Sequence, residues 1–497
     1  MRSKVEINRL STGVPGLDAV LGGGLPEFSF NLIVGPPGSG KTTLAHQLMF
    51  SMATKERPAL FFTVLGESPL MMLRYQQQFT FFDSEKINEA IHFVNLGDNV
   101  VDGRFDQVLA RIMKEVKAHS PGVVFVDSFR SIMLEADHSS GSPIGAQHFI
   151  QQLGTQLRSW QVTSFFLGEY PIESDSPPIF TVADGLLSMC QSVSRNSMVR
   201  KIQILKMRGQ ETSPGIHTFR ITSDGIEIFP AAAITGDSSV AGTPSQLPRS
   251  DKRLAMGVPG LDAMLGGGLP SGYSLLVAGP SGSGKTILAT AFLAEGVRLG
   301  EPGVIVAFEQ TPSQSWTRTI DDLVRAGKIG LINTRLLDLS IDEIVQRMFD
   351  TIKRVKATRV VIDSLSGFEL AVAPSFREDF RESLFRMVSV LANLGVTVLM
   401  TSELEDRYTD LRFSPYGSAF LTDAIIVQRY IEIDSHLKRV MAVVKVRGSS
   451  HSDDLREYKI TDKGIVIGDP MVDFAGLLAG RPTQEVFAEF RPRSKPR

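Results

Sequence analysis

Residues 29–43 read SFNLIVGPPGSGKTT, and residues 273–287 read YSLLVAGPSGSGKTI. In both stretches an apolar run leads into the pattern G-x-x-x-x-G-K-T, and a segment with helical spacing of apolar residues follows. Glycines at this spacing let successive backbone N–H groups turn toward an anion, and the next helix presents its positive end. The two stretches therefore predict two phosphate-binding loops, each between a buried strand and a helix.

The two loops belong to a longer internal repeat. Residues 10–43 and 254–287 align without a gap and are identical at 22 of 34 positions. Later landmarks recur in the same order, since Asp127 and Asp363 each end an apolar run and each half closes with a strand–turn–strand pattern. The two copies begin at residues 10 and 254, so the period of the repeat is far longer than the roughly 20–50 residues of solenoid repeats. A period of this length indicates a duplicated domain.

Short apolar runs alternate with amphipathic segments in each half. Near-continuous apolar strands between helices are typical of a mainly parallel sheet with helices on both faces. The patterns at 219–229 and 458–467 add an antiparallel hairpin at the end of each half. We therefore expect an α/β fold with two tandem P-loop NTPase domains, the first over 1–230, a linker over 231–252, the second over 253–470 and a tail over 471–497.

The composition excludes several classes of protein. With 42% hydrophobic residues, 44 Gly and 26 Pro among 497, the chain is neither disordered nor collagen-like. The 52 Lys and Arg balance 54 Asp and Glu, which does not support extensive nucleic-acid binding. No apolar run approaches the roughly 20 residues of a membrane helix, and the single cysteine, Cys190, suits a reducing compartment. We expect a soluble cytoplasmic protein without membrane contact.

The residues of the loops have distinct expected roles. Lys41 and Lys285 reach the β- and γ-phosphates and neutralise charge there, while the hydroxyls of Thr42 and Thr286 bind Mg²⁺. A glycine-rich turn without nucleotide is the alternative, but the flanking strand and helix favour a phosphate cradle. We therefore expect ATP and Mg²⁺ at both loops, held by Gly35, Gly38, Ser39, Gly40, Lys41, Thr42 and Thr43 and by Gly279, Gly282, Ser283, Gly284, Lys285, Thr286 and Ile287.

An aspartate at the end of a buried strand completes each predicted metal site. Asp127 follows VVFV, and Asp363 follows VVI. A carboxylate in this position holds the hydration shell of Mg²⁺ in phosphate-transferring sites. Because Asp-Ser also begins helices, the alternative is that either aspartate caps a helix.

The sequence resembles the KaiC-type ATPases in three features. These are GVPGLDxxLGGGLP before each loop, the tandem loops themselves, and the K-[MV]-R-G strand late in each half. The resemblance runs from about Leu10 to Pro470. It implies two RecA-like domains per chain and a homohexamer of two stacked rings, with nucleotide at each subunit boundary.

In that family the K-[MV]-R-G strand contacts the neighbouring subunit's nucleotide. Residues i and i+2 of a strand share a face, so the lysine and arginine of each pair point the same way, as a positive clamp requires. A charged edge strand is the alternative. The resemblance implies nucleotide contacts from Lys206, Met207, Arg208, Arg439, Lys445, Val446, Arg447, Ser449 and His451, with Gln210 and Thr212 a weaker match in the first half.

The family also has two adjacent glutamates that polarise the attacking water. Here the first half has Gly66 and Glu67, and the second has Glu309 and Gln310, so each half keeps one carboxylate at a different position. If the first position carries the base, the second half is the better hydrolase; otherwise the order reverses. We favour Glu309, which we also expect at the metal, with Glu67 as the other catalytic candidate. A surface glutamate at a strand end is the alternative for each.

The clock members of the family carry a phosphorylated Ser-Thr pair in the second domain. Ala419 and Phe420 stand in those places here and have no hydroxyl, while Ser414, Ser418 and Thr422 lie nearby. We therefore expect a KaiC-like ATPase whose nucleotide state controls conformation and partner binding in signalling. The alternatives are a serine/threonine autokinase with clock-like activity and a RecA-like DNA-dependent ATPase.

The tail over 471–497 begins with an apolar patch and ends in RPRSKPR. It either docks a regulatory or signalling protein, as this region does in the family, or is disordered. Nucleic acid is not the partner we favour, because the charges of the basic segment 198–208 are already assigned to nucleotide.

Overall fold

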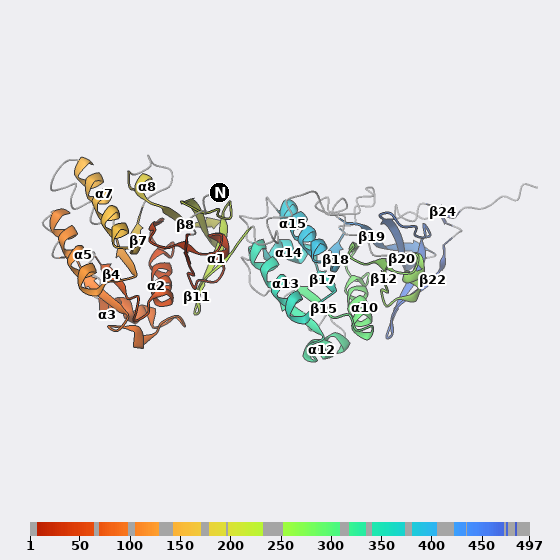
Figure 1. The fold of residues 1–497 in the computed structure, drawn as a ribbon. Coiled ribbons are helices and arrows are strands. Elements are labelled where there is room, and N and C mark those ends of the chain that lie inside the picture. The colour runs from red at the N-terminus through yellow and green to blue at the C-terminus, as the bar shows by residue number, and fades with distance from the viewer. Residues whose placement is uncertain are drawn as a thin grey trace, which may run out of the picture. The chain divides into compact units, whose positions relative to one another are not determined.

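The computed structural model describes residues 7–63, 69–97, 105–128, 143–169, 178–194, 197–231, 252–308, 318–333, 340–372, 380–404, 422–433, 435–471, 474–475 and 483–484. The chain divides into two compact units, residues 1–236 and 237–497 (Figure 1). The narrower boundaries expected above stay a prediction, since residues 232–251 lie outside the described part. Over the described ranges, none of the helices combines the length and apolar character that crossing a membrane requires.

A nine-stranded sheet forms the centre of the first unit. Its strands are β3 (Phe30–Val34), β4 (Ala59–Thr63), β5 (Ile91–Asn95), β6 (Val123–Asp127), β7 (Thr163–Gly168), β8 (Gly185–Ser194), β9 (Ser197–Met207), β10 (His217–Thr222) and β11 (Gly225–Phe229). The order is β11-β10-β9-β8-β3-β7-β6-β4-β5. Pairing is parallel from β8 to β5 and antiparallel from β8 to β11. A two-stranded ribbon, β1 (Arg9–Leu10) with β2 (Leu25–Pro26), precedes this sheet.

Helices cover both faces of this sheet (Figure 1). They are α1 (Leu17–Val20), α2 (Lys41–Met52), α3 (Pro69–Gln76), η1 (Ser84–Lys86), α5 (Phe105–His119), α7 (Pro143–Ser159) and α8 (Pro178–Val182). Apolar residues of α2 share one core with alternate residues of β3, β6 and β7, and those of α5 and α7 share the other core. Every residue of β3 and β4 is buried, which explains why these strands read as continuous apolar runs.

The second unit repeats this topology. Its strands are β14 (Ser274–Gly279), β15 (Gly303–Ala307), β16 (Ile329–Asn333), β17 (Arg359–Asp363), β18 (Thr397–Glu403), β19 (Ala424–Ile433), β20 (His436–Val446), β21 (Arg456–Thr461) and β22 (Gly464–Pro470). The order is β16-β15-β17-β18-β14-β19-β20-β21-β22. Two short ribbons also form, β12 (Arg253–Leu254) with β13 (Leu269–Pro270) and β23 (Phe474–Ala475) with β24 (Thr483–Gln484).

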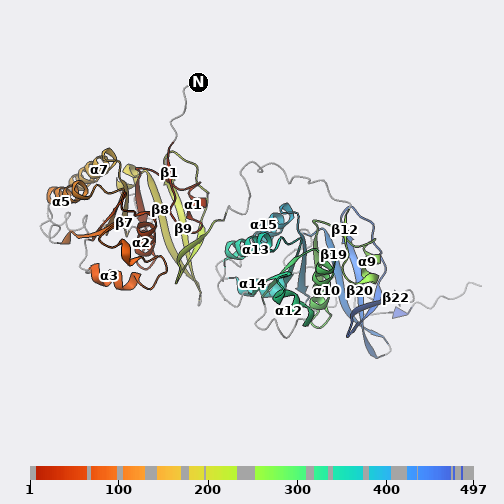
Figure 2. The same cartoon turned by 60° about the horizontal axis from the view of Figure 1, so that its bottom comes forward.

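Helix α10 (Lys285–Arg298) occupies the place that α2 has in the first unit, with its apolar residues in one core with β14, β17 and β18. The other helices are α9 (Pro259–Met264), α12 (Arg318–Arg325), α13 (Ile341–Val355), α14 (Leu365–Ala371) and α15 (Phe380–Asn393). Figure 2 shows α2 and α10 lying against their own sheets in the same way.

The structure confirms the α/β class, the duplicated domain and the mainly parallel sheets. The antiparallel part is larger than expected, because a long hairpin, β8–β9 or β19–β20, precedes the predicted one in each half. Strand β8, with the sequence GLLSMCQSVS, escaped the sequence analysis because polar residues interrupt its apolar run. Strands β5 and β16 lie at the parallel edge of their sheets and are short.

Candidate nucleotide-binding sites

Each phosphate loop connects the end of a buried central strand to a helix. Residues 35–40 lie between β3 and α2, and residues 280–284 lie between β14 and α10. The residue before each helix has a left-handed backbone, with φ of 98° at Gly40 and 97° at Gly284. A Cβ at these positions would lie 3.0 Å from Ile221 Cδ1 and 2.9 Å from Ile460 Cδ1. The left-handed backbone therefore favours glycine at this point of the pattern, whereas the isoleucine side-chain ends could shift to make room.

The two lysines lie within their own loops. Lys41 Nζ donates to the carbonyl oxygens of Gly35 and Pro36, both at 2.9 Å. Lys285 Nζ donates to the matching carbonyls of Gly279 and Pro280 at 2.8 Å. Burial lowers the pKa of Lys41, and the carboxylates of Glu169 and Asp127 oppose that change. Each ammonium is therefore placed where the loop would receive phosphate oxygens.

The predicted metal ligands meet in pairs. Thr42 Oγ1 donates to Asp127 Oδ2 at 2.9 Å, and Thr286 Oγ1 donates to Asp363 Oδ2 at 2.8 Å. A hydroxyl beside a carboxylate is an oxygen donor set that suits Mg²⁺, which keeps several waters and phosphate oxygens as further ligands. Among the described residues, no group of three or more His, Cys, Asp or Glu side chains could hold a metal ion.

The helix-cap alternative can be checked in the second half. Helix α14 is capped by Ser364, whose Oγ accepts a hydrogen bond from Gly367 N at 3.2 Å. Asp363 instead accepts from Thr286 on one oxygen and from the Thr401 hydroxyl on the other. The serine caps the helix and the aspartate faces the phosphate loop, so the two residues of the Asp-Ser pair have separate roles.

The lysine and arginine of the first-half pair bind backbone and acid groups on one side of β9. Lys206 Nζ donates to the carbonyls of Phe180 and Thr181 at 3.1 Å. Arg208 donates to the Thr181 carbonyl and to Asp184 Oδ1, both at 3.2 Å. Burial and then Arg208 lower the pKa of Lys206. The shared carbonyl confirms that the two side chains point the same way.

The second-half pair has a related arrangement. Lys445 Nζ donates to the Thr422 carbonyl at 2.6 Å, and Arg447 forms an ion pair with Asp423 at 3.6 Å. Burial, followed by Arg447, lowers the pKa of Lys445. Strands β9 and β20 lie inside their sheets, between β8 and β10 and between β19 and β21. Their pairing with β10 and β21 covers only Arg200–Ile202 and Arg439–Met441, so near the cationic residues each strand is paired on one side and the edge-strand alternative stays open.

The two cationic pairs are Lys206 with Arg208 and Lys445 with Arg447. Each pair lies at the ends of the parallel strands opposite to the ends that carry its own phosphate loop. Asp184 Oδ2 accepts from Phe30 N at 3.1 Å, and Asp423 Oδ2 accepts from Ser274 N at 3.1 Å. Phe30 and Ser274 begin β3 and β14, whereas the phosphate loops follow the other ends of these strands. Strands of five or six residues span about 16–20 Å.

The other residues predicted to contact nucleotide lie at different ends of the strands, some beside the cationic pairs and one toward the phosphate loop. Met207 and Val446 end β9 and β20 beside the cationic pairs. Arg439 instead lies 5.4 Å from the ring of Tyr430, whose hydroxyl donates to the Ser281 carbonyl in the phosphate loop at 3.4 Å. Arg439 therefore lies toward the loop of its own chain.

The motif before each loop packs against the segment after each cationic pair. Gln210 Nε2 donates to the carbonyls of Leu21 and Gly24 at 2.6 and 2.8 Å. In the second half, Arg253 donates to the carbonyls of Leu265 and Gly268 and to Ser449 Oγ. Near it, the Ser452 amide donates to the Met264 carbonyl, and the intervening His451 is half-buried. The repeated motif GVPGLDxxLGGGLP could have indicated that this segment supports the residues after each cationic pair. Its structural role was not predicted from the sequence.

Several predicted residues lie outside the described ranges. These are the catalytic candidates Glu67 and Glu309, their neighbours Gly66 and Gln310, and Ser414, Ser418, Ala419 and Phe420. Their roles stay predictions.

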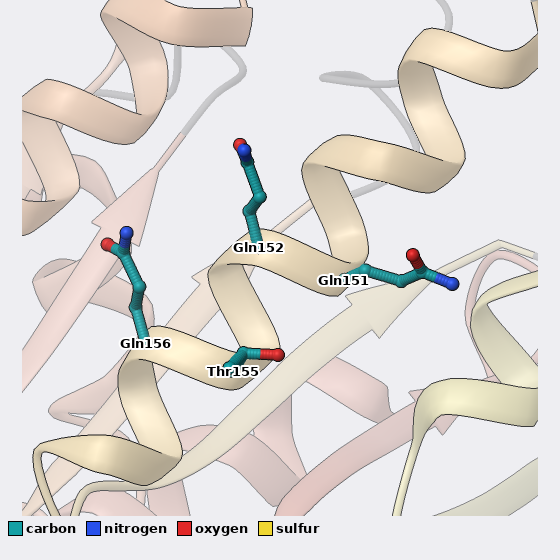
Figure 3. A pocket seen from close by; sticks show the side chains of 4 residues that line it. All are labelled: Gln151, Gln152, Thr155 and Gln156. Atoms are coloured by element: carbon teal, nitrogen blue, oxygen red, sulfur yellow. The ribbon is translucent and has the colours of Figure 1, made fainter.

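One surface hollow lies away from both loops. Its lining comes from successive turns of α7, and Figure 3 shows the side chains of Gln151, Gln152, Thr155 and Gln156. These are uncharged amides and one hydroxyl, so the lining contains no titratable group.

A phosphate loop at the carboxyl edge of a parallel sheet, with a Thr–Asp pair beside it, defines a P-loop nucleotide-binding domain. The chain has two such domains. The family described as "ATPase: KaiC" matches residues 10–233 and 254–471. The chain belongs to this ATPase family, and the resemblance found in the sequence is confirmed.

Similarity to individual proteins extends over nearly the whole chain. The circadian clock oscillator protein KaiC of Picosynechococcus sp. is 29% identical over 500 residues, covering 96% of this chain and 93% of that protein. The circadian clock protein KaiC3 of Synechocystis sp. is 29% identical over 495 residues, covering 96% and 95%. The circadian clock oscillator protein KaiC of Thermostichus vulcanus is 27% identical over 500 residues, covering 97% and 93%.

Proposed function

We propose that this protein binds and hydrolyses ATP at both phosphate loops within a ring-shaped homohexamer. Each site is completed by Lys206 and Arg208, or by Lys445 and Arg447, of the neighbouring subunit. Nucleotide state then controls conformation and the binding of a signalling or regulatory protein, for which the tail is the proposed dock, in the cytoplasm. The observation that supports this proposal most is the position of the cationic pairs at the sheet edge opposite to their own loop.

A cation at that end of the strands cannot reach the loop of its own unit, so we propose that a second subunit brings its loop there. The strand between the loop and the pair spans about 16–20 Å, which is longer than a lysine or arginine side chain. A contact that joins one end of a subunit to the opposite end of the next is heterologous, and such contacts form a closed ring when the rotation between subunits closes, as we propose here, and an open filament otherwise. The relatives named above are clock proteins, which agrees with the proposed signalling role.

The proposed reaction is in-line attack of water on the γ-phosphate. The water oxygen bonds to the γ-phosphorus while the bond to the β–γ bridging oxygen breaks, and the electron pair leaves with ADP. Lys41 or Lys285 and the neighbour's cations neutralise the developing charge. Mg²⁺, held by Thr42 and Asp127 or by Thr286 and Asp363, adds positive charge at the phosphate oxygens when bound. Glu309, and Glu67 in the first half, are the proposed residues that orient the water and accept its proton.

Hydrolysis is favoured over autophosphorylation by the surroundings of Thr422. This residue is the described hydroxyl nearest to the positions of the family's phosphorylated pair, and its exposed fraction is 0%. Its carbonyl oxygen also accepts from Lys445. A phosphoryl acceptor must reach the γ-phosphate, so a fully buried threonine fits that role poorly.

Two sets of substitutions test the proposal in the full-length chain. Lys41→Ala and Lys285→Ala, made singly, should each reduce bound ATP analogue from two molecules per chain to one in calorimetry. Mixing then tests the shared sites. Chains with Lys41→Ala and Lys285→Ala should lack turnover, as should chains with Lys41→Ala and Arg447→Ala, whereas mixed rings should regain ATPase activity.

Recovery is expected because some interfaces in the mixed rings combine an intact second loop with an intact Arg447. Undiminished binding in both lysine variants would show that the loops are not the nucleotide sites. Absence of recovery on mixing, although sedimentation shows mixed rings, would contradict contribution by the neighbour. Sedimentation that finds only monomers with ATP analogue would contradict the ring itself.

A further inference from the structure

Two glutamates occupy matching places beside the phosphate loops. Glu169 directly follows β7, and Glu403 is the last residue of β18. These strands pair with β3 and β14, the strands that enter the loops. In the second half Glu403 is the direct partner of Gly279. In the first half the pairing of Val34 with Gly168 brings Glu169 to the same level as Gly35.

Strand alternation shows on which face these carboxylates lie. Residues i and i+2 of a strand share a face. Leu167, two residues before Glu169, belongs to the core that α2 covers. Thr401, two residues before Glu403, donates to Asp363. Both glutamates therefore continue the face that carries the metal-site aspartate and the helix after the loop.

The charge environment agrees with this placement. The Glu169 carboxylate is the principal charged neighbour that favours the Lys41 ammonium, ahead of Asp127. Glu169 is half-buried and Glu403 is exposed, so solvent reaches both positions. Each phosphate loop thus has a solvent-accessible carboxylate level with its first glycine, and in the first half this carboxylate is also a charged neighbour of the loop lysine.

We propose that Glu169 and Glu403 are water-positioning carboxylates, each accepting a hydrogen bond from the water that attacks the γ-phosphate. The proposal rests on ATP hydrolysis at these loops, and it assigns no proton transfer to either residue. The two halves differ at the predicted catalytic glutamates, since Glu67 and Glu309 do not match in position, whereas they agree at Glu169 and Glu403. A carboxylate in this place also repels the γ-phosphate, so it should weaken ATP binding while it raises turnover.

Each glutamate is tested in a chain with one working loop. Glu169→Gln is made in the Lys285→Ala chain, and Glu403→Gln in the Lys41→Ala chain. We expect turnover to fall about 10- to 100-fold, as on loss of a group that orients a reactant. ATP analogue should bind about 5-fold tighter, because a nearby negative charge is removed. ADP affinity should change much less, because ADP lacks the γ-phosphate.

Conservative and control variants separate this role from a structural one. Glu169→Asp and Glu403→Asp keep the charge and should keep the weaker ATP binding, with intermediate turnover. Glu85→Gln on η1 and Glu382→Gln on α15, both exposed, should change neither quantity. Unchanged turnover and ATP affinity in the site variants would overturn the proposal.

Equal weakening of ATP and ADP binding, together with a lower melting temperature, would also overturn it, because that result indicates a structural role. Failure of the proposed function is seen separately. The parent chains with one lysine substituted would then still bind two nucleotides, or would show no turnover from the remaining loop before any glutamate is changed.

Discussion

In the second half two polar side chains hold the phosphate loop, whereas the matching positions in the first half are apolar. Tyr458 donates its hydroxyl to the Ser283 carbonyl at 2.5 Å, and Gln428 Oε1 accepts from Ser283 Oγ at 3.0 Å. In the first half, strand pairing puts Phe219 and Met189 in those places, and both approach the loop at Gly40.

Despite this difference the two loops have the same left-handed backbone at their last two glycines. Gly38 and Gly282 both have φ of 75°, and Gly40 and Gly284 differ by one degree. The glycine pattern therefore sets the shape of the loop, and the supporting side chains are free to vary. Any difference between the two sites in stability or in nucleotide affinity should then arise from the side chains that surround each loop.

The largest expected effect is at Arg359, which takes the place of Val123 at the start of the matching strand. Its exposed fraction is 0%, and it donates to Glu301 at 2.7 and 3.0 Å and to two backbone carbonyls. Arg359→Ala should lower the free energy of unfolding of the second half by about 3–5 kcal/mol, because it leaves a partly buried carboxylate and two carbonyls short of donors. Hydrogen exchange by mass spectrometry under denaturant reports each half separately.

The control for Arg359 is an exposed ion pair on the same half. Arg298 binds Glu295 at 2.6 Å on the surface of α10, and Arg298→Ala should leave both halves nearly unchanged. An equal loss of stability in the two halves of the Arg359 variant would contradict a local role.

A pH-dependent difference is expected at His46, where the second half has Thr290. The His46 ring stacks on Phe61 at 4.6 Å, and burial lowers its pKa to about 3. The unfolded chain, with a pKa of about 6.5, binds this proton more readily, so the stability is fully present above pH 6.5 and falls toward pH 3. At pH 5 the first half should have lost about 2 kcal/mol through this group.

Denaturant unfolding of the first half at pH 7 and pH 5 measures this loss. His46→Thr copies the second half and should reduce the difference between the two pH values by most of that amount. An equal pH dependence in the variant and the parent chain would show that His46 is not the responsible group.

The smallest expected effect comes from the Tyr458 hydroxyl. Burial raises the pKa of Tyr458 above its usual value, so the hydroxyl stays protonated and donates. Tyr458→Phe should cost the second half about 1 kcal/mol and weaken its ATP analogue binding a few-fold. The reciprocal Phe219→Tyr tests whether the first loop gains from the same contact. Calorimetry on the full-length chain that finds the second site unchanged would show that its loop does not need this support.

Local sequence patterns predict the parts of each site that are close together in the chain. The loops, Lys41, Thr42 and the strand ending at Asp127 follow from local spacing, and the structure brings the threonine and aspartate together. The same patterns do not indicate Tyr458 and Gln428, because the contacts of these residues with Ser283 span 175 and 145 residues of the chain. No local pattern specifies a pairing over such separations.

The sequence by itself determined the duplicated domain and the shape of the phosphate loops. These depend on steric limits at individual glycines and on the apolar content of single strands, which act over a few residues. Only the tertiary structure decided at which edge of the sheet Lys206 and Arg208 lie, and that Glu169 reaches the level of Gly35. These positions depend on the order and direction of strands in the sheet, which arise from packing between segments far apart in the chain.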